Sequence, residues 1–397
     1  MRVLATTAAL ACILAASIPA AAQARTAFIR PDGRAVSMAK LDRDVRRLVR
    51  AAKIQGLGVA LIENGRVVSL KTYGVANVAQ NTPMRPDTVI YAASLTKAAF
   101  AYMCMQLVDE GVLDLDKPIG EYLKKPLPDY DNYKDLAGDP RWRKITPRML
   151  LSHTAGFPNY RWINDDKKLN LMFDPGTRYA YSGEGILLMQ FVLEEGLGLN
   201  VAEEMQRRVF DRFGMRRSSL TWRDDFVGNM ADRYDLDGKD LGHPHNMHAH
   251  ASGSMDSTLS DYAHFLAGVA RGDGLSAKAK AEMLTPQITI TSRRQFPTQV
   301  FDDTDENKAI ALSYGLGWGL YRTPWGEAFF KEGHDDGAAN YALCVEARHG
   351  TRCVLFMSNT VRAEGIYKYL ADEILGDTHL PWQWEAYRPY DLTPEAQ

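Results

Sequence analysis

The sequence places a serine and a lysine three residues apart, at Ser94 and Lys97, where a predicted helix begins. The residues behind them, 98–108, are rich in helix-forming side chains, and Gly111 follows as an end signal. Residues three positions apart share one face of a helix, so this hydroxyl and this amine can touch. A serine hydroxyl becomes a good nucleophile when a neighbouring base takes its proton. The spacing therefore predicts a pair able to form a covalent acyl-enzyme.

A lysine acts as that base near neutral pH only if desolvation or nearby positive charge lowers its pKa. Apolar neighbours of Lys97, such as Leu95 and Phe100, would supply the desolvation. The helix start adds backbone N–H groups and the positive end of the helix dipole, which suit a developing oxyanion. The alternative is an ordinary helix cap at Ser94 with Lys97 on a solvated face, and this short motif alone does not exclude it.

The elements that must position this pair change in type along the chain. A helical pattern at 39–53 precedes two β-rich runs, 57–62 and 67–73, which flank the strong turn signal Asn64-Gly65. Helical patterns and long loops follow, including amphipathic helices at 186–193 and at 258–269, the latter with Thr258 or Ser260 as its cap. Strand patterns return later, before a final helix at 363–375; these strands are expected at 315–321, 328–331, 339–346 and 351–359.

This order predicts an α/β (α+β) fold in which an antiparallel sheet is built from both chain ends and flanked by helices. The sheet region is expected at about 40–93 and 310–376, with a mainly helical subdomain inserted at about 94–309. We expect residues 25–397 to form a single domain. Ser94 lies where the chain leaves the sheet region, so a cleft is expected over it.

Composition narrows the choice of partners. The net charge of −2 and the absence of a basic run or zinc-finger spacing argue against nucleic acid. The N-terminus reads as a signal peptide over residues 1–24, with Arg2, an apolar run and a cleavage site at Ala22-Gln23-Ala24. We therefore expect a periplasmic or secreted protein without stable membrane insertion after cleavage. An uncleaved membrane helix, or lipidation at Cys12, is the lesser alternative.

Three cysteines would remain after cleavage. Cys104 lies in the apolar helix after Ser94 and reads as a buried small hydrophobe. Cys344 and Cys353 flank a tight turn between two predicted strands, where an oxidising compartment permits a cross-strand disulfide and strand geometry decides whether it forms.

Three motifs in order resemble the serine β-lactamase and penicillin-binding-protein superfamily, in the class C-like branch that includes related esterases and D-amino-acid peptidases. They are Ser94-Leu95-Thr96-Lys97, residues 150–157 and Pro175-Gly176-Thr177. The resemblance extends over about 59–359, which is nearly the whole mature chain. It implies a serine hydrolase mechanism that needs no cofactor and no metal.

The resemblance also implies further site residues. The family's Y-x-N element falls on Tyr181-Ser182-Gly183, so Tyr181 would relay a proton, with its pKa lowered by nearby positive charge. Gly183 stands where the pattern usually has Asn. The third element, K-T-G or a His variant, fits residues 332–337 best, which places His334 at the lysine position and Asp336 at the usual glycine. The oxyanion hole would then be formed by the backbone N–H groups of Ser94 and Gly337.

Charge suggests the kind of substrate. Asp335 and Asp336 would repel the free carboxylate of a β-lactam or a peptidoglycan stem peptide. We therefore expect a small neutral or amine-bearing ester, amide or peptide substrate, with esterase-like or peptidase-like activity and poor β-lactamase activity. The alternatives are a β-lactamase or D-Ala-D-Ala carboxypeptidase, and a catalytically silent binding protein on the same fold.

A cluster of four histidines suggests a different class of protein, a metalloenzyme. His243, His245, His248 and His250 are dense enough to suggest zinc or copper binding. Pro244 breaks any helix there, and no cysteine lies nearby, so we favour a loop that lines the cleft.

Overall fold

The computed structural model describes residues 25–391. The signal peptide predicted at residues 1–24 lies outside the described residues. Within them, the centre of the fold is a nine-stranded sheet in which every neighbouring pair is antiparallel. In spatial order its strands are β10 (Ile288–Thr289), β11 (Ser313–Tyr314), β12 (Gly319–Thr323), β13 (Gly326–Asp335), β14 (Ala338–Ala347), β15 (Gly350–Ser358), β3 (Gly56–Glu63), β4 (Arg66–Asn77) and β5 (Thr82–Pro83).

The two ends of the chain meet where β15 pairs with β3. This confirms the predicted sheet built from both termini. The β3–β4 hairpin turns at Asn64 and Gly65, both of which have positive φ, as the sequence predicts for such a pair. Strands in the middle of the sheet are buried on both faces, which explains their nearly continuous apolar sequences; β15 is one example.

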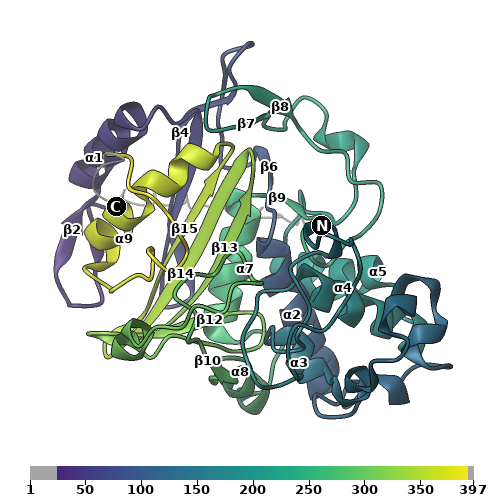
Figure 1. Ribbon diagram of the computed structural model, residues 1–397. Coiled ribbons are helices and arrows are strands. Elements are labelled where there is room, and N and C mark those ends of the chain that lie inside the picture. The colour runs from purple at the N-terminus through teal and green to yellow at the C-terminus, as the bar shows by residue number, and fades with distance from the viewer. Residues whose placement is uncertain (1–24, 392–397) are drawn as a thin grey trace, which may run out of the picture.

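Helices cover both faces of the sheet (Figure 1). On one face lie α1 (Met38–Ala51) and α9 (Glu364–Leu375), which pack against each other and on the apolar residues of the sheet. Helix α1 buries Leu41, Val45, Leu48 and Val49 at helical spacing, as predicted. The other face packs on α7 (Leu259–Arg271) and α2 (Leu95–Asp109). Thr258 caps α7 by accepting a hydrogen bond from the Asp261 N–H, which confirms one of the two predicted caps.

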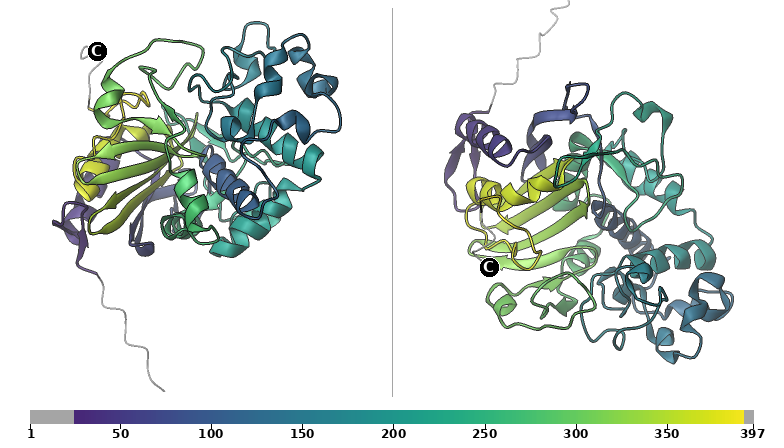
Figure 2. Two further views of the ribbon diagram at one scale, coloured as in Figure 1. Left: turned by 90° about the horizontal axis from the view of Figure 1, so that it is seen from below. Right: turned by 45° about the horizontal axis from the view of Figure 1, so that its top comes forward.

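The chain between α2 and α7 forms a mostly helical region beside the sheet, which Figure 2 shows from two sides. Its helices are α3 (Pro147–Leu151), α4 (Gly183–Phe191), α5 (Val201–Met205) and α6 (Asp211–Phe213), and α8 (Ala277–Met283) follows α7. Paired short strands complete the fold: β1 (Ala27–Ile29) with β2 (Ala35–Ser37), β6 (Val89–Tyr91) with β9 (Asp256–Thr258), and β7 (Arg233–Tyr234) with β8 (Asp240–Gly242).

Helix α2 runs through the interior between these two regions. Thirteen of its residues are buried, from Leu95 to Leu107, so it has almost no polar face. A helix that is apolar all round belongs inside a large core. Whatever its first turn presents is therefore held rigidly.

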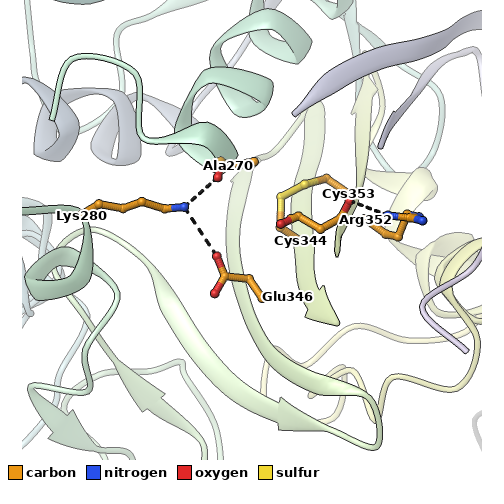
Figure 3. Close-up of a disulfide and its surroundings, with 7 residues drawn as sticks. Ala270, Lys280, Cys344, Glu346, Arg352 and Cys353 are labelled. Atoms are coloured by element: carbon orange, nitrogen blue, oxygen red, sulfur yellow. Dashed lines mark hydrogen bonds and ion pairs between the residues drawn. A yellow bond between two sulfur atoms is a disulfide. The ribbon is translucent and has the colours of Figure 1, made fainter. Parts of the chain in front are cut away.

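The cross-strand disulfide that the sequence left open is formed. Cys344 on β14 and Cys353 on β15 are direct partners in the sheet register, and their sulfurs are bonded (Figure 3). Beside it, Lys280 of α8 donates to the Ala270 carbonyl over 2.7 Å and faces Glu346 of β14 at 3.7 Å. Cys104 is a buried free thiol, as expected.

Within residues 25–391 no single helix has the length and apolar character needed to cross a membrane. Two consecutive helical segments, Gly183–Gly196 and Val201–Phe213, would qualify only when taken together, and they meet at a bend of 105°.

Candidate active site

Ser94 occupies the first turn of α2, directly after strand β6. The preceding Ala93 has a φ of 46°, an uncommon conformation for a residue with a side chain, so the connection is tight and strained. The Ser94 N–H makes no hydrogen bond to any other described residue. The hydroxyl and a free N–H are thus presented together at the start of a buried helix.

Lys97 lies directly against this hydroxyl. Its Nζ donates to Ser94 Oγ over 2.9 Å and also to the Ser252 carbonyl oxygen. The lysine side chain is 1% exposed. Burial, followed by the positive charge of Lys331, holds the pKa of Lys97 well below its ordinary value. The structure therefore brings the predicted pair together and desolvates the amine, as the sequence analysis expected.

Tyr181 completes the cluster from the loop before α4. Its phenol oxygen accepts a hydrogen bond from Lys331 Nζ over 3.2 Å, and the Nζ atoms of Lys97 and Lys331 lie 4.9 and 4.8 Å from its ring centroid. The predicted lowering of its pKa is wrong. Burial, followed by the charge of Glu332, raises the pKa of Tyr181 well above the ordinary value, although the adjacent Ser94 hydroxyl opposes this rise. The phenol is therefore held in its protonated form.

Lys331 of β13 is the residue that sequence reasoning missed. It is completely buried and donates to both the backbone oxygen and Oε1 of Glu332, the latter over 2.7 Å. Gln295 Nε2 donates to the same carboxylate oxygen over 3.0 Å. Burial lowers the pKa of Lys331 below its ordinary value, and the contact with Glu332 opposes this lowering without cancelling it. Of the two buried lysines at the site, only Lys331 contacts a carboxylate.

His334 does not take the place predicted for it. Its imidazole Nδ1 contacts Glu364 at the start of α9, and 47% of the side chain is exposed. Residues 331 and 334 are an odd number of positions apart on one strand, so their side chains project from opposite faces of the sheet. The lysine, and not the histidine, therefore reaches Tyr181.

Gly337 also does not take the oxyanion-donor position that the sequence analysis predicts for it. Its N–H already donates to Asp335 Oδ1 over 2.8 Å, at the turn between β13 and β14, so it does not serve as an oxyanion donor. Gly333 instead lies against the start of α2: a Cβ added there would be 2.6 Å from the Ala92 oxygen and 3.0 Å from the Leu95 nitrogen. The strand can approach the serine this closely only because Gly333 has no side chain.

The sheet register places a second backbone N–H group near the start of α2. Gly326 begins β13 with its N–H donating to Thr323 Oγ1 of β12, so its backbone faces that neighbour. Backbone groups of every second residue on a strand face the same edge, and β13 keeps an unbroken register with β14 from Gly326 to Asp335. The N–H of His334 therefore faces the β12 edge, where pairing with β12 has ended at Phe330. The His334 backbone, next to Gly333, thus faces the same opening as Ser94.

A family comparison agrees with this geometry. The family model described as Beta-lactamase matches residues 41–375, which is most of the chain. The chain belongs to the beta-lactamase family. Members of this family are serine hydrolases that act through an acyl-enzyme.

Curated relatives within the family differ in activity. The chain is 26% identical to a beta-lactamase of Pseudomonas fluorescens, over 72% of this chain and 74% of the relative. It is 25% identical to a lovastatin esterase of Penicillium rubens, over 70% and 82%. Among solved structures, D-alanine carboxypeptidase AmpC from Burkholderia cenocepacia shares the fold with a TM-score of 0.67 and 18% identity, over 85% of this chain and 98% of the other.

In this beta-lactamase family member, Lys331-Glu332-Gly333 gives the best geometric fit to the K-T-G element. It retains the lysine beside the tyrosine and the glycine beside the serine helix, with Glu332 in the middle position. The segment lies three residues earlier than the predicted one. A signal for it was present in the sequence, since the charged residues Lys331 and Glu332 directly follow the apolar run Ala328-Phe329-Phe330 of the same strand.

The Y-x-N element is changed in a way that the structure explains. A Cβ added at Gly183 would fall 2.5 Å from the ring of Tyr160, so this ring fills the space that an asparagine would need. Asn159 Oδ1 accepts the Gly183 N–H over 3.0 Å. Glu184 does not substitute for the missing amide, because its carboxylate is paired with Arg161 at 2.7 Å.

His153, within the motif at 150–157, supports the tyrosine. Its Nδ1 accepts the Ser182 N–H over 3.2 Å, and its ring lies 4.5 Å from the ring of Tyr181. Burial, followed by the charge of Lys97, holds the pKa of His153 well below its ordinary value. A neutral imidazole therefore packs against Tyr181 and positions it.

The histidine cluster is dispersed in the structure. The ring of His243 lies between the Ala231 carbonyl oxygen and Asp256 Oδ1, at 2.8 and 3.0 Å, whereas the ring of His245 stacks on Trp222 with centroids 3.7 Å apart. Among residues 25–391 no group of three or more His, Cys, Asp or Glu side chains is arranged to hold a metal ion.

Proposed function

We propose that this chain is an exported serine hydrolase that cleaves an ester or amide through an acyl-enzyme on Ser94. The observation that carries the proposal is the division of charge between two buried lysines. Lys331 Nζ is paired with the Glu332 carboxylate at 2.7 Å, which favours its charged form, whereas Lys97 contacts Ser94 Oγ at 2.9 Å and no carboxylate. The amine of Lys97 is therefore the neutral base that a serine nucleophile needs.

The mechanism follows from these positions. Lys97 takes the Ser94 proton as Oγ attacks the substrate carbonyl carbon. The N–H groups of Ser94 and His334 donate to the oxyanion, where one such donor is worth about 3 kcal/mol of the barrier. Tyr181, kept protonated by burial and held by Lys331, passes a proton to the leaving group and is reprotonated from Lys97. Water then attacks the acyl-enzyme, with Lys97 as the base again.

A neutral substrate fits this site best, although for a different reason from the one predicted. Asp335 is paired with Arg233 at 2.6 Å, so its repulsion of a carboxylate is largely cancelled. The lysine that could attract a carboxylate is 0% exposed and neutralised by Glu332. The cluster therefore offers no free positive charge to a β-lactam carboxylate, which supports esterase-like or peptidase-like activity.

Export is supported by two observations. The first 24 residues have the composition of a signal peptide. The Cys344–Cys353 disulfide is of the kind that persists in oxidising compartments. A periplasmic or secreted location satisfies both.

Turnover of two matched substrates tests the proposal. Wild-type protein should hydrolyse a short-chain nitrophenyl ester, and Ser94→Ala should lose this activity by at least about 10³-fold. Benzylpenicillin should be hydrolysed far more slowly than the ester. Efficient penicillin hydrolysis would overturn the neutral-substrate argument. Absence of ester turnover and of any covalent adduct would favour a binding protein on the same fold.

A further inference from the structure

A pocket with an aromatic wall opens beside the candidate active site. It has a volume of about 290 Å³, and its lining includes Tyr91, Tyr160, Trp162, Leu187 and Ser252. No carboxylate, ammonium or guanidinium group belongs to any residue that lines it. Its walls thus combine flat aromatic rings, an aliphatic side chain, the imidazole of His250 and small polar groups.

One residue of the pocket lining, Ser252, also contacts the candidate catalytic cluster. The Ser252 carbonyl oxygen accepts a hydrogen bond from Lys97 Nζ, the amine that contacts Ser94. Tyr160 lies against Gly183, two residues from Tyr181. A group in this pocket would therefore be attached close to a carbonyl held at Ser94.

Two stacked aromatic rings, those of Tyr160 and Trp162, form one wall of the pocket. The rings of Tyr160 and Trp162 are nearly parallel, at 9°, with centroids 4.1 Å apart, and 61% of Trp162 is exposed. The indole of Trp162 is open to solvent and lies flat on the half-buried ring of Tyr160, so it offers an unpartnered stacking surface. Tyr91 adds a neutral phenol, because burial, followed by the charge of Asp335, raises its pKa far above physiological pH.

We propose that this pocket binds a flat, uncharged aromatic group of the substrate, next to the bond that is cleaved. The proposal rests on the proposed hydrolase function and names its substrate class: aryl-bearing esters or amides. Stacking on the Tyr160–Trp162 wall supplies the selectivity, and the lining residues carry no carboxylate, ammonium or guanidinium group that would pair with an ionised substrate.

Three esters and two variants test this proposal. The esters are methyl phenylacetate, with the ring on the acyl side; benzyl acetate, with the ring on the alcohol side; and ethyl butyrate, with no ring. Trp162→Ala should lower kcat/KM about tenfold for at least one aromatic ester and less than twofold for ethyl butyrate. The matched control is Phe301→Ala, which removes another exposed ring, 47% exposed and outside the pocket, and should leave all three rates unchanged. An equal loss on all three esters, or no loss on either aromatic ester, would overturn the proposal.

Binding without turnover separates this proposal from the proposed function. Calorimetry with Ser94→Ala should show that methyl phenylacetate or benzyl acetate binds at least about fivefold more tightly than ethyl butyrate, and that adding Trp162→Ala abolishes the difference. This result would support the pocket even if the wild-type protein hydrolysed nothing. Equal binding of the three esters would refute it even if the wild-type protein were an active hydrolase.

Discussion

At the scale of single residues, the site depends on which of two buried lysines is charged. Lys97 and Lys331 both approach the Tyr181 ring, at 4.9 and 4.8 Å, and two uncompensated ammonium groups would repel each other strongly in this environment. Glu332 reduces this repulsion because its carboxylate pairs with Lys331 alone. In the proposed mechanism, activation of Ser94 by Lys97 therefore depends on a carboxylate that does not touch Ser94.

Glu332→Gln tests this dependence. Glu332 raises the pKa of Lys331 against the lowering effect of burial, so the variant should have a lower Lys331 pKa. The proposed mechanism requires protonated Lys331 beside Tyr181. As the pH is raised, the activity of the variant should therefore begin to fall at a lower pH than that of the wild type. We expect kcat to fall about 10- to 100-fold and the alkaline limb of the kcat/KM profile to move to lower pH.

The control is Glu327→Gln, an exposed carboxylate on the same strand, which should leave the profile unchanged. Circular dichroism would verify that both variants fold. A Glu332→Gln profile that superimposes on that of the wild type would show that this carboxylate does not set the lysine charges.

At the scale of elements, the site is made where β13 meets the first turn of α2. Gly333 permits this approach, and the unbroken register of β13 turns the His334 N–H toward the same opening. Helix α2 contributes rigidity, since nearly all of its residues are buried. The oxyanion hole thus depends on the fit of a strand to a helix as well as on the residues themselves.

Gly333→Ala should disrupt this fit. The added Cβ would come within 2.6 Å of the Ala92 backbone oxygen, so the strand and the helix must separate. We expect a loss of about 1–3 kcal/mol in the free energy of unfolding and at least about a hundredfold loss in kcat. Urea unfolding and ester turnover would measure the two effects.

Gly253→Ala is the control for stability, because its added Cβ would meet nothing closer than 3.7 Å. It should unfold at the same urea concentration as the wild type. Full activity in Gly333→Ala would contradict the proposed arrangement of oxyanion donors.

Elements with strong local signals could be predicted from the sequence. The Asn64-Gly65 hairpin, the cap of α7 at Thr258 and the helix after Ser94 depend on neighbouring residues, and the structure confirms all three. The strand predicted at 328–331 instead extends to Asp335. Because the predicted strand ended at residue 331, the prediction did not show that Lys331 and His334 belong to one strand and project from opposite faces. The K-T-G element was therefore assigned three residues too late.

At the scale of the whole molecule, the sheet joins both chain ends and the inserted helical region stands beside it (Figure 2). This arrangement followed from the order of strand and helix patterns. The contacts of Lys331 with Tyr181 and of Tyr160 with Gly183 did not, because each joins segments from different parts of the chain and leaves no local pattern. The sequence therefore predicted the architecture and the contact between Ser94 and Lys97 better than it predicted the groups that surround this pair.

The central claim is that Ser94 becomes acylated. The most direct measurement is intact-mass analysis, with peptide mapping, of wild-type protein and Ser94→Ala after acid quenching during turnover of a nitrophenyl ester, and after exposure to a fluorophosphonate. We expect a mass increase equal to the acyl or phosphonyl group, located on the peptide that contains Ser94 and absent from Ser94→Ala. An adduct that persists in Ser94→Ala, or none in the wild type with either reagent, would contradict it.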